Sequence, residues 1–346
     1  MKKIFIRADG NPVLGLGHII RCCSIAEALE KKGVFCCFLV ADEDSAIIVR
    51  EHGFRVLQLN SMWNDLDQEV NSMINIIQTE QIDLLLIDSY YISDNYLKKM
   101  RQYTTTAYLT GMNNFLYPVD ILINYHIYAK HLGYQEQYKK NTKLVLGCQF
   151  APLRREFSIE PIYMRDEKKI FITTGGTDPY EVMPALLELL LESDCKQWEY
   201  HIIIGKYYKK QEIEKLYKLK DKTRNIFFYK DIQNIEKIMK NCSIAVSAAG
   251  STLYELCACG IPTVVFAFAD NQLLSLKAFS EQNFAESAGD VRQNFTENLK
   301  KIVDGVLRYA MNKELCIKRS NSNRKKIDGK GAERLAKILI YESSRG

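Results

Sequence analysis

The stretch Gly15-Leu-Gly-His-Ile-Ile-Arg21 decides how the first half of the chain folds. It follows the run Lys3-Ile-Phe-Ile-Arg7, which predicts a β-strand, and opens a helix that we expect to reach about Lys32. The glycines permit a tight turn, and the helix N-terminus presents N–H groups to a phosphate or a developing anion. His18, a neutral base near pH 7, is therefore expected at the mouth of a ligand site. The open alternative is an ordinary strand–turn–helix unit in which His18 only caps or packs.

The length and charge of the chain restrict its class. With 346 residues, of which 47% are hydrophobic, the chain is long enough for two α/β domains. The 47 basic and 42 acidic residues leave a net charge of +5, which suits an anionic small molecule and lacks the basic excess of nucleic-acid-binding proteins. We expect a small-molecule substrate, no nucleic-acid partner, and a monomer.

The ten cysteines favour neither disulfides nor a metal site. Cys22-Cys23 and Cys36-Cys37 are adjacent pairs, whose side chains point apart in a helix or strand, and Cys257-Ala-Cys259 lacks metal-ligand spacing. We interpret the cysteines as small buried residues of a protein in a reducing cytosol. No signal peptide opens the sequence and no apolar run reaches about 18 residues, so we expect a soluble, cytoplasmic protein with no membrane partner.

The first half alternates short apolar runs with helical patterns, which predicts a mostly parallel sheet covered on both faces. Ligands of such sheets collect at the carboxyl ends of the strands, so Arg7–His18 and Asp88-Ser-Tyr-Tyr91 are expected on one rim. The expected strands are Lys3–Arg7, Val34–Val40, Arg55–Leu59, Leu84–Asp88, Ala107–Thr110, Ile121–Asn124 and Leu144–Leu146.

The periodicity breaks between Phe150 and Lys168, where turn-forming and charged residues predict a linker. A second Gly-rich turn, Thr174-Gly-Gly-Thr-Asp178, then leads through Pro179 into an apolar helix whose first turn suits proline. A third turn, Ser247-Ala-Ala-Gly-Ser-Thr252, also follows a strand and opens a helix. The expected strands of this half are Ile170–Thr173, His201–Ile204, Ile226–Phe228, Ile244–Val246 and Thr263–Phe266.

These patterns predict two Rossmann-like domains with a cleft between them. We expect residues 1–155 to form the N-terminal domain and residues 165–330 the C-terminal one, with a last helix over residues 331–346 that packs back on the first domain.

The turns of the second half suit a nucleoside diphosphate. Backbone N–H groups and the hydroxyls of Ser251 and Thr252 would bind phosphate oxygens, and Glu255 would accept hydrogen bonds from the ribose hydroxyls. Each feature has an alternative: an ordinary turn for Gly175-Gly176, helix capping for the two hydroxyls, and surface exposure for Glu255. Their occurrence at equivalent points of two successive domains favours the ligand hypothesis.

Two nucleotide-dependent classes are disfavoured. Neither Gly-rich turn is followed by a Walker lysine, which argues against an ATPase. A nicotinamide enzyme would explain Gly15-x-Gly17 and Asp42, but Ile20 stands in place of the third glycine.

An ordered set of motifs resembles the UDP-sugar hydrolases of pseudaminic acid biosynthesis, which release UDP from UDP-2,4-diacetamido-2,4,6-trideoxy-β-L-altropyranose. The set spans almost the whole chain and is specific where no single motif would be. It comprises Arg7-x-Asp9, Gly15-x-Gly17-His18-x-x-Arg21, Asp88-Ser-Tyr90, Leu153-Arg154-x-Glu156-Phe157 within Gly147–Phe157, Gly175-Gly176-Thr177-Asp178, Ser247–Glu255 and Asn271-Gln272.

The resemblance implies a GT-B-like fold, similar to the peptidoglycan GlcNAc transferase, with UDP held mainly by the second domain. It also implies that His18 is the catalytic histidine, which we expect to act as general base with Asp9 as its orienting carboxylate. We further expect hydrolysis with inversion and without a cofactor, and no metal because no carboxylate or histidine cluster suggests a metal site. The implied substrate-binding residues are Arg7, Gly15, Gly17, Arg21, Tyr90, Gly175, Gly176, Thr177, Asp178, Ser251, Thr252, Glu255, Asn271 and Gln272.

Two positions depart from the family pattern. Ser89 stands where a histidine is expected, and His126 stands where an asparagine is expected, so both bear on sugar specificity more than on UDP binding. Two other functions remain open: a GT-B glycosyltransferase that uses a UDP-amino sugar donor, and a nucleotide-sugar-binding protein without turnover.

Overall fold

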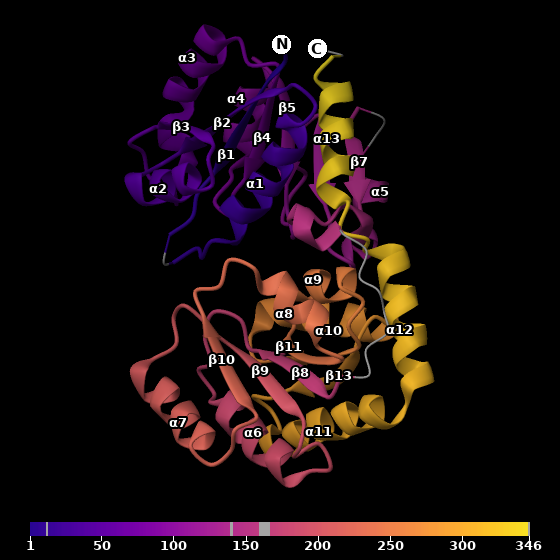
Figure 1. The fold of residues 1–346 in the computed structure, drawn as a ribbon. Helices are drawn as coiled ribbons and strands as arrows, with labels where there is room; N and C mark the ends of the chain where they lie inside the picture. Colours follow the sequence, from indigo (N-terminus) through magenta and orange to yellow (C-terminus); the bar gives the residue numbers. More distant parts are fainter. Residues whose placement is uncertain (12, 139–140, 159–166, 345–346) are drawn as a thin grey trace. The chain divides into compact units, whose positions relative to one another are not determined.

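The computed structural model describes all residues except 12, 139–140, 159–166 and 345–346 (Figure 1). Residues 159–166 of the predicted linker therefore lie outside the described residues. The chain divides into two compact units, a first unit of Met1–Arg155 with Gly329–Gly346 and a second unit of Glu156–Asp328. Each unit is built on a parallel sheet, which confirms the predicted α/β class.

The sheet of the first unit has the order β3-β2-β1-β4-β5-β6-β7, and its described strands all pair in parallel. Every residue of β4 is buried, as expected for a central strand covered on both faces. The strands are β1 (Lys3–Ala8), β2 (Phe35–Val40), β3 (Arg55–Gln58), β4 (Leu84–Asp88), β5 (Thr105–Leu109), β6 (Ile121–Asn124) and β7 (Lys143–Leu146).

Helices between these strands supply the covering layers. α3 and α4 bury Met73, Ile77 and Leu97 in the same core cluster as Leu85 and Ile87 of β4. The helices are α1 (Gly17–Glu30), α2 (Glu43–Glu51), α3 (Val70–Glu80), α4 (Asp94–Arg101), α5 (Tyr134–Gln137) and α13 (Gly331–Glu342), with short 3₁₀ turns η1 (Leu66–Glu69), η2 (Ala129–His131) and η3 (Cys148–Phe150).

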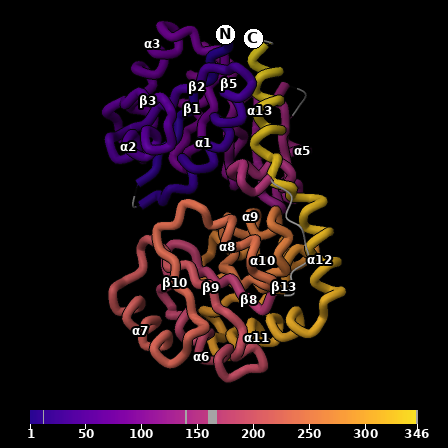
Figure 2. Tube along the Cα trace, viewed as in Figure 1, coloured from indigo at the N-terminus to yellow at the C-terminus, as the bar shows by residue number. Residues whose placement is uncertain are grey.

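The C-terminal helix α13 completes the first unit by packing beside α1 (Figure 2). Lys2 Nζ donates to the carbonyl of Ile340 at 2.8 Å, and Arg334 donates to the carbonyl of Gln149 at 3.0 Å. A Cβ on Gly331 would meet the carbonyl oxygen of Ala151 at 2.0 Å, so the helix can begin this close to the chain only with glycine. The chain thus returns to its first unit after the second is complete.

The second unit repeats the plan with the order β10-β9-β8-β11-β12-β13. Its strands are β8 (Lys169–Thr173), β9 (Glu199–Ile204), β10 (Ile226–Lys230), β11 (Ile244–Ala248), β12 (Thr263–Ala267) and β13 (Glu286–Asp290). Its helices are α6 (Val182–Glu192), α7 (Lys210–Lys220), α8 (Ile235–Asn241), α9 (Thr252–Ala258), α10 (Asp270–Glu281), α11 (Phe295–Met311) and α12 (Lys313–Lys326), with η4 (Arg155–Ser158) at the start.

Two sequence expectations for this unit need correction. The last strand, β13, was not predicted, because Glu286-Ser-Ala-Gly-Asp290 has little apolar character and pairs only with β12 at the sheet edge. Pro179 does not lie in the first turn of α6, which begins three residues later at Val182 after Glu181 adopts a left-handed conformation with φ of 54°. Within the described part of the chain, no helix has both the length and the apolar character that a membrane span requires.

Candidate active site

The carboxyl ends of β1 and β4 bring the start of α1 against the end of β4. These strands are parallel neighbours, with Ala8 paired to Asp88. α1 begins at Gly17, so His18 lies in its first turn. The Nδ1 atom of His18 lies 2.7 Å from Oδ1 of Asp88, and both side chains are almost fully buried. Residues 70 positions apart in the sequence thus form one buried pair.

The contact with Asp88 indicates the tautomer of His18. An ionised carboxylate only accepts hydrogen bonds, so a nitrogen 2.7 Å from it carries the proton. Arg21 also approaches Nδ1, at 2.8 Å, but its guanidinium only donates and already donates to the same Asp88 oxygen at 2.5 Å. We therefore assign the proton to Nδ1, which leaves the lone pair of Nε2 available to accept a proton.

Arg21 holds Asp88 in its ionised state. The guanidinium donates twice to the carboxylate, from Nε to Oδ2 at 2.6 Å and from Nη2 to Oδ1 at 2.5 Å. Burial by itself would raise the pKa of Asp88, but the charge of Arg21 and the hydrogen bonds from Arg21 and His18 hold that pKa well below its usual range. Arg21 was expected to bind substrate; its guanidinium is instead engaged by Asp88.

The other ring nitrogen of His18 is unoccupied. Nε2 is buried and has no hydrogen-bond partner among the described residues. Tyr90 packs its ring edge-on against the imidazole, with centroids 4.4 Å apart at 85°, while more than half of Tyr90 stays exposed. Asp88 orients the imidazole through Nδ1, and Nε2 keeps a lone pair without a partner among the described residues. Such a base is suited to take a proton from a small ligand.

Asp9 does not orient His18, contrary to the sequence expectation. One carboxylate oxygen accepts from Nη1 of Arg7 at 2.5 Å and the other accepts from the backbone N–H of Ala41 at 2.7 Å. Arg7 is fully buried and also donates twice to Glu69, at 2.6 and 3.0 Å, so it does not reach a ligand. Both residues therefore hold the rim of the sheet together.

The loop that joins β1 to α1 has the tight turn predicted for it. Gly15 has φ of 74° and its N–H donates to the carbonyl of Asn11 at 2.8 Å. A left-handed residue is required where the loop turns back on itself, which explains a glycine at position 15. Gly17 is the first residue of α1.

The second unit has a cavity of about 540 Å³ at the carboxyl edge of its sheet. Three of its walls come from the loops after β8, β11 and β12, and Ile203 and Ile235 add apolar surface. The predicted residues that line it are Gly175, Gly176, Thr177, Ser251, Thr252, Asn271 and Gln272.

The loop after β9 holds the Gly-rich turn in place. The hydroxyl of Thr174 donates to the carbonyl of Thr177 at 2.8 Å and therefore accepts from the hydroxyl of Tyr208 at 2.5 Å. A Cβ on Gly205 would lie 2.3 to 2.4 Å from the carbonyl oxygens of Gly175 and Gly176. The turn is therefore packed too closely on its neighbour for any larger residue at position 205.

Asp178 is a helix cap and not a ligand-facing carboxylate, which corrects the sequence expectation. Its two oxygens accept from the N–H groups of Val182 and Met183 at 2.9 and 2.8 Å. Burial raises the pKa of Asp178 to about 6, although these two hydrogen bonds oppose the shift. The N–H groups at the start of α6 are thus already occupied, and the Gly-rich turn itself faces the cavity.

The hydroxyls of Ser251 and Thr252 line the cavity, and Ser251 makes no side-chain capping bond with α9. Glu255 lies in the first turn of α9 and is half-buried. Gln272 accepts from the N–H of Phe268 at 2.9 Å, whereas the neighbouring Asn271 is exposed. Hydroxyl and amide groups thus surround the cavity, and Glu255 is not among the described residues that line it.

The departures from the family pattern lie on the first unit. The ring of His126 is stacked between Tyr125 and Tyr128, at centroid distances of 4.7 and 5.0 Å. Burial and then the charge of Arg21 lower the pKa of His126 to about 4, so this imidazole is neutral at pH 7. Ser89 caps its own loop by accepting from the N–H of Tyr91 at 3.1 Å. Sequence patterns did not indicate the aromatic stack. Its tyrosines follow β6 at a junction without the Gly-rich turn that marked the other candidate sites.

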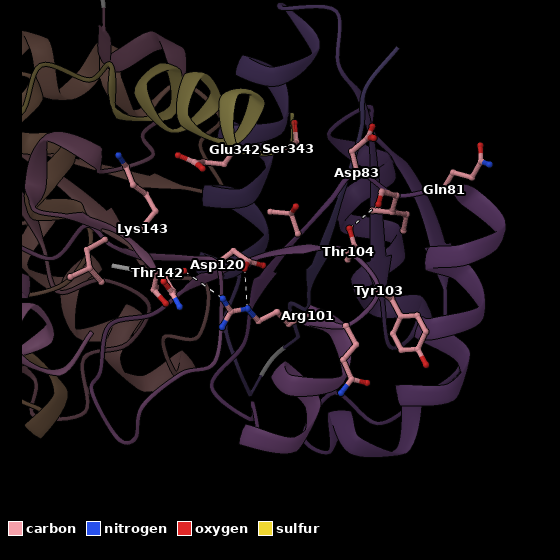
Figure 3. A pocket seen from close by; sticks show the side chains of 15 residues that line it. Gln81, Asp83, Arg101, Tyr103, Thr104, Asp120, Thr142, Lys143, Glu342 and Ser343 are labelled. Atoms are coloured by element: carbon pink, nitrogen blue, oxygen red, sulfur yellow. Dashed lines mark hydrogen bonds and ion pairs between the residues drawn. The ribbon is translucent and has the colours of Figure 1, made fainter. Parts of the chain in front are cut away.

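A larger hollow of about 1100 Å³ lies at the opposite, amino-terminal edge of the first sheet (Figure 3). Its polar side chains largely satisfy one another: Arg101 donates to Asp120 at 2.9 Å, and Thr104 donates to the carbonyl of Ile82 at 2.7 Å. Parallel α/β sheets bind ligands at the carboxyl edge, so we place the candidate site there and not in this hollow.

The described residues contain no group of three or more His, Cys, Asp or Glu side chains that could hold a metal ion. No disulfide joins the ten cysteines, all of which lie in the described part of the chain.

Comparison with known proteins finds a family match that covers most of the second unit. Residues 170–335 match the model of the glycosyltransferase family 28 C-terminal domain. The match covers just under half of the chain, and this part is therefore similar to that family. This similarity agrees with the GT-B-like resemblance that the motifs gave.

Curated relatives extend the similarity beyond this domain. The chain is 27% identical over 256 residues to the UDP-2,4-diacetamido-2,4,6-trideoxy-beta-L-altropyranose hydrolase of Campylobacter jejuni, covering 73% of this chain and 87% of that protein. It is 24% identical to the spore coat polysaccharide biosynthesis protein SpsG of Bacillus subtilis, covering 97% of this chain and 98% of that protein. The resemblance to the hydrolase family is thereby confirmed.

A third relative is longer than this chain. The uncharacterized protein MJ1062 of Methanocaldococcus jannaschii is 27% identical over 279 residues, which are 76% of this chain and 55% of that protein. The chain thus spans about half the length of this relative.

Solved structures confirm the GT-B-like fold. MurG of Acinetobacter baumannii superposes with a TM-score of 0.70 over 99% of this chain and all of that one, at 12% identity. A putative UDP-N-acetylglucosamine 2-epimerase of Listeria monocytogenes superposes with a TM-score of 0.68 over 100% of this chain and 98% of that one, at 13% identity. S. aureus MnaA, in a UDP co-structure, superposes with a TM-score of 0.67 over 99% of this chain and 96% of that one, at 13% identity. Since an epimerase shares the fold with glycosyltransferases, the reaction has to be argued from the site.

Proposed function

We propose that the chain is a UDP-sugar hydrolase that releases UDP from UDP-2,4-diacetamido-2,4,6-trideoxy-β-L-altropyranose, a step in pseudaminic acid biosynthesis. The observation that carries the proposal is the buried His18–Asp88 pair, which leaves Nε2 of His18 without a partner among the described residues. The similarity to the Campylobacter jejuni hydrolase supports the choice of substrate.

The reaction begins with a water molecule that gives a proton to Nε2 of His18 as its oxygen attacks the anomeric carbon. The bond between sugar C1 and the UDP oxygen breaks, and its electron pair leaves with UDP. Attack opposite the leaving group inverts the anomeric configuration, and the proton passes from His18 to solvent. A general base of this kind contributes about 10²–10⁴-fold to the rate.

Asp88 acts on the reaction through His18. It holds the tautomer in which Nε2 is the acceptor, and its negative charge stabilises the imidazolium that forms. Arg21 keeps Asp88 ionised and fixes its orientation through two hydrogen bonds. Tyr90, which contacts the imidazole, would contact the sugar.

UDP would bind in the cavity of the second unit. Gly175, Gly176, Ser251 and Thr252 line it and would donate to the diphosphate oxygens, whose charge grows as the C1–O bond breaks. Glu255, in the first turn of α9, would accept from the ribose hydroxyls. Neighbouring donors replace a metal ion in this scheme, so we expect turnover to survive treatment with EDTA.

The test is incubation of the pure protein with the UDP-diacetamido-sugar in the absence of any acceptor. The proposal predicts stoichiometric release of UDP and the free sugar. A protein that binds the UDP-sugar and releases no UDP under these conditions would contradict it.

A second candidate, a glycosyltransferase with a UDP-amino sugar donor, is favoured by the similarity to the family 28 domain and to the fold of MurG. In that reaction an acceptor hydroxyl takes the place of water, and His18 serves as the same base. Turnover that starts only when a sugar or lipid acceptor is added would favour the transferase.

A further inference from the structure

The β1–α1 loop holds a second buried atom without a partner, besides Nε2 of His18. Asn11 is only 5% exposed, and its side-chain oxygen accepts from the N–H groups of Val13 and Leu14, both at 2.9 Å. These two donors identify the oxygen and so fix which way the amide points. Its Nδ2 is buried and has no partner among the described residues.

The loop needs only one of the two amide atoms. The bonds to Val13 and Leu14 use the oxygen, which aspartate would supply equally well. A buried donor without a partner costs about 1–3 kcal/mol. The amide nitrogen of Asn11 therefore adds nothing to the folded loop and lowers its stability unless another molecule accepts from it.

The two atoms without a partner among the described residues, one in this loop and one in the first turn of α1, have complementary chemistry. Nδ2 of Asn11 donates, whereas Nε2 of His18, with its proton on Nδ1, accepts. The turn is short: the carbonyl of Asn11 accepts from Gly15, and His18 follows in the first turn of α1. A single oxygen that accepts from one group and donates to the other would satisfy both, and water is the smallest such molecule.

We propose that Asn11 is a further catalytic residue, whose Nδ2 donates a hydrogen bond to the water molecule that His18 deprotonates. This inference rests on the proposed hydrolysis. Water has two protons and two lone pairs. With one lone pair bound by Asn11 and one proton given to His18, the second lone pair has a defined direction and attacks the anomeric carbon. Asn11 thus orients the nucleophile and leaves its activation to His18.

The discriminating variant is Asn11→Asp, which keeps the oxygen that caps the loop and loses the donor. We expect kcat to fall by about 10- to 100-fold, the scale of losing one aligned hydrogen bond to a reacting group. KM and UDP affinity should stay close to those of the wild type. The unfolding temperature should fall, because the second carboxylate oxygen is buried without a partner, so kcat is compared at a temperature at which both proteins are folded. Asn75→Asp, an exposed change of the same charge on α3, is the matched control. Wild-type kcat in Asn11→Asp would overturn the inference, since a purely structural Asn11 predicts that result.

Asparagine-selective ¹⁵N labelling gives a second measurement that does not depend on turnover. The side-chain amide signal that disappears in Asn11→Asp belongs to Asn11. We expect this signal to shift when the UDP-sugar is added and to stay in place with UDP alone. An unshifted signal with bound UDP-sugar would overturn the role of Asn11. Failure of the wild type to release UDP would instead overturn the proposed hydrolysis, with the signal still reporting on Asn11.

Discussion

Nδ1 of His18 lies 2.7 Å from Oδ1 of Asp88, and this contact leaves Nε2 as the only basic atom of the imidazole. A histidine that packs without function needs no such orientation, nor a carboxylate whose charge is held in place by a partly buried arginine. The pair has the arrangement of a base and its orienting acid.

Replacement of Asp88 by asparagine should lower kcat by about 10²–10⁴-fold, because the amide no longer selects the tautomer with a free Nε2. Substrate release assays measure the loss, and calorimetry should show unchanged UDP affinity because the UDP cavity belongs to the second unit. His18→Asn should cost at least two orders of magnitude. Near-normal kcat in Asp88→Asn would remove the carboxylate from the mechanism.

Asp88→Asn also leaves the charge of the partly buried Arg21 without its carboxylate partner, which lowers stability. The double variant Asp88→Asn with Arg21→Gln restores the charge balance and is the control. If the double variant regains stability and full activity, the loss in the single variant came from misfolding.

Replacement of Ser251 by alanine and of Thr252 by valine should each weaken UDP binding by about 0.5–1.5 kcal/mol, or roughly 2- to 10-fold in Kd. The unfolding temperature should change little with Ser251→Ala, because that hydroxyl makes no capping bond with α9. Calorimetric titration with UDP checks both variants, with Ser322→Ala on the exposed face of α12 as control. An unchanged Kd for UDP in both variants would mean that these hydroxyls do not bind the diphosphate.

Replacement of Arg7 by methionine should lower the free energy of unfolding by about 3–5 kcal/mol, because it leaves Asp9 and Glu69 buried without their shared partner. Arg50→Met removes an ion pair whose side chains are half exposed and should cost under about 1 kcal/mol. Urea unfolding compares the two. Equal losses would mean that the Arg7 network does not stabilise the rim.

Asp178 should give the second unit a pH-dependent stability. Its pKa is raised to about 6 from an ordinary 3.8, so between these values the folded state binds more protons than the unfolded state. The contribution of Asp178 to the free energy of unfolding is greatest below about pH 4. It falls by up to about 3 kcal/mol as the pH rises to about 6, and it does not change further at higher pH.

Urea unfolding of wild type and Asp178→Asn at pH 4.5 and pH 7.5 measures this contribution. The advantage of the wild type over the variant should be larger at pH 4.5. Asp304→Asn, on an exposed position of α11, is the control and should alter the pH profile little. If the wild type gains stability relative to Asp178→Asn as the pH rises to 7.5, the pKa of Asp178 is not raised in the folded protein.

The sequence predicted the two parallel sheets and the position of His18, because apolar strand runs and Gly-rich turns are local signals. It also placed Asp88 on the same rim as His18. It assigned the orienting role to Asp9 because that residue is close in sequence, whereas the structure turns Asp9 toward Arg7 and Ala41. Which carboxylate meets the imidazole depends on how the start of α1 meets the end of β4, and no local pattern encodes that.

Some residues with a structural role were predicted to bind substrate, for a related reason. Arg7 and Asp178 belong to the motifs, but their charges are used inside the fold, one in a buried network and the other as a helix cap. The aromatic stack around His126 and the unpaired amide of Asn11 were missed, since burial and missing partners are properties of the folded chain.

The central claim is that water attacks the sugar carbon, and turnover in ¹⁸O-labelled water tests it most directly. With the UDP-diacetamido-sugar and no acceptor, mass spectrometry should find one ¹⁸O atom in the free sugar and none in UDP. Early product should have the anomeric configuration opposite to that of the substrate. Label in UDP would mean attack at phosphorus and would contradict the account, as would a product that retains the configuration of the substrate.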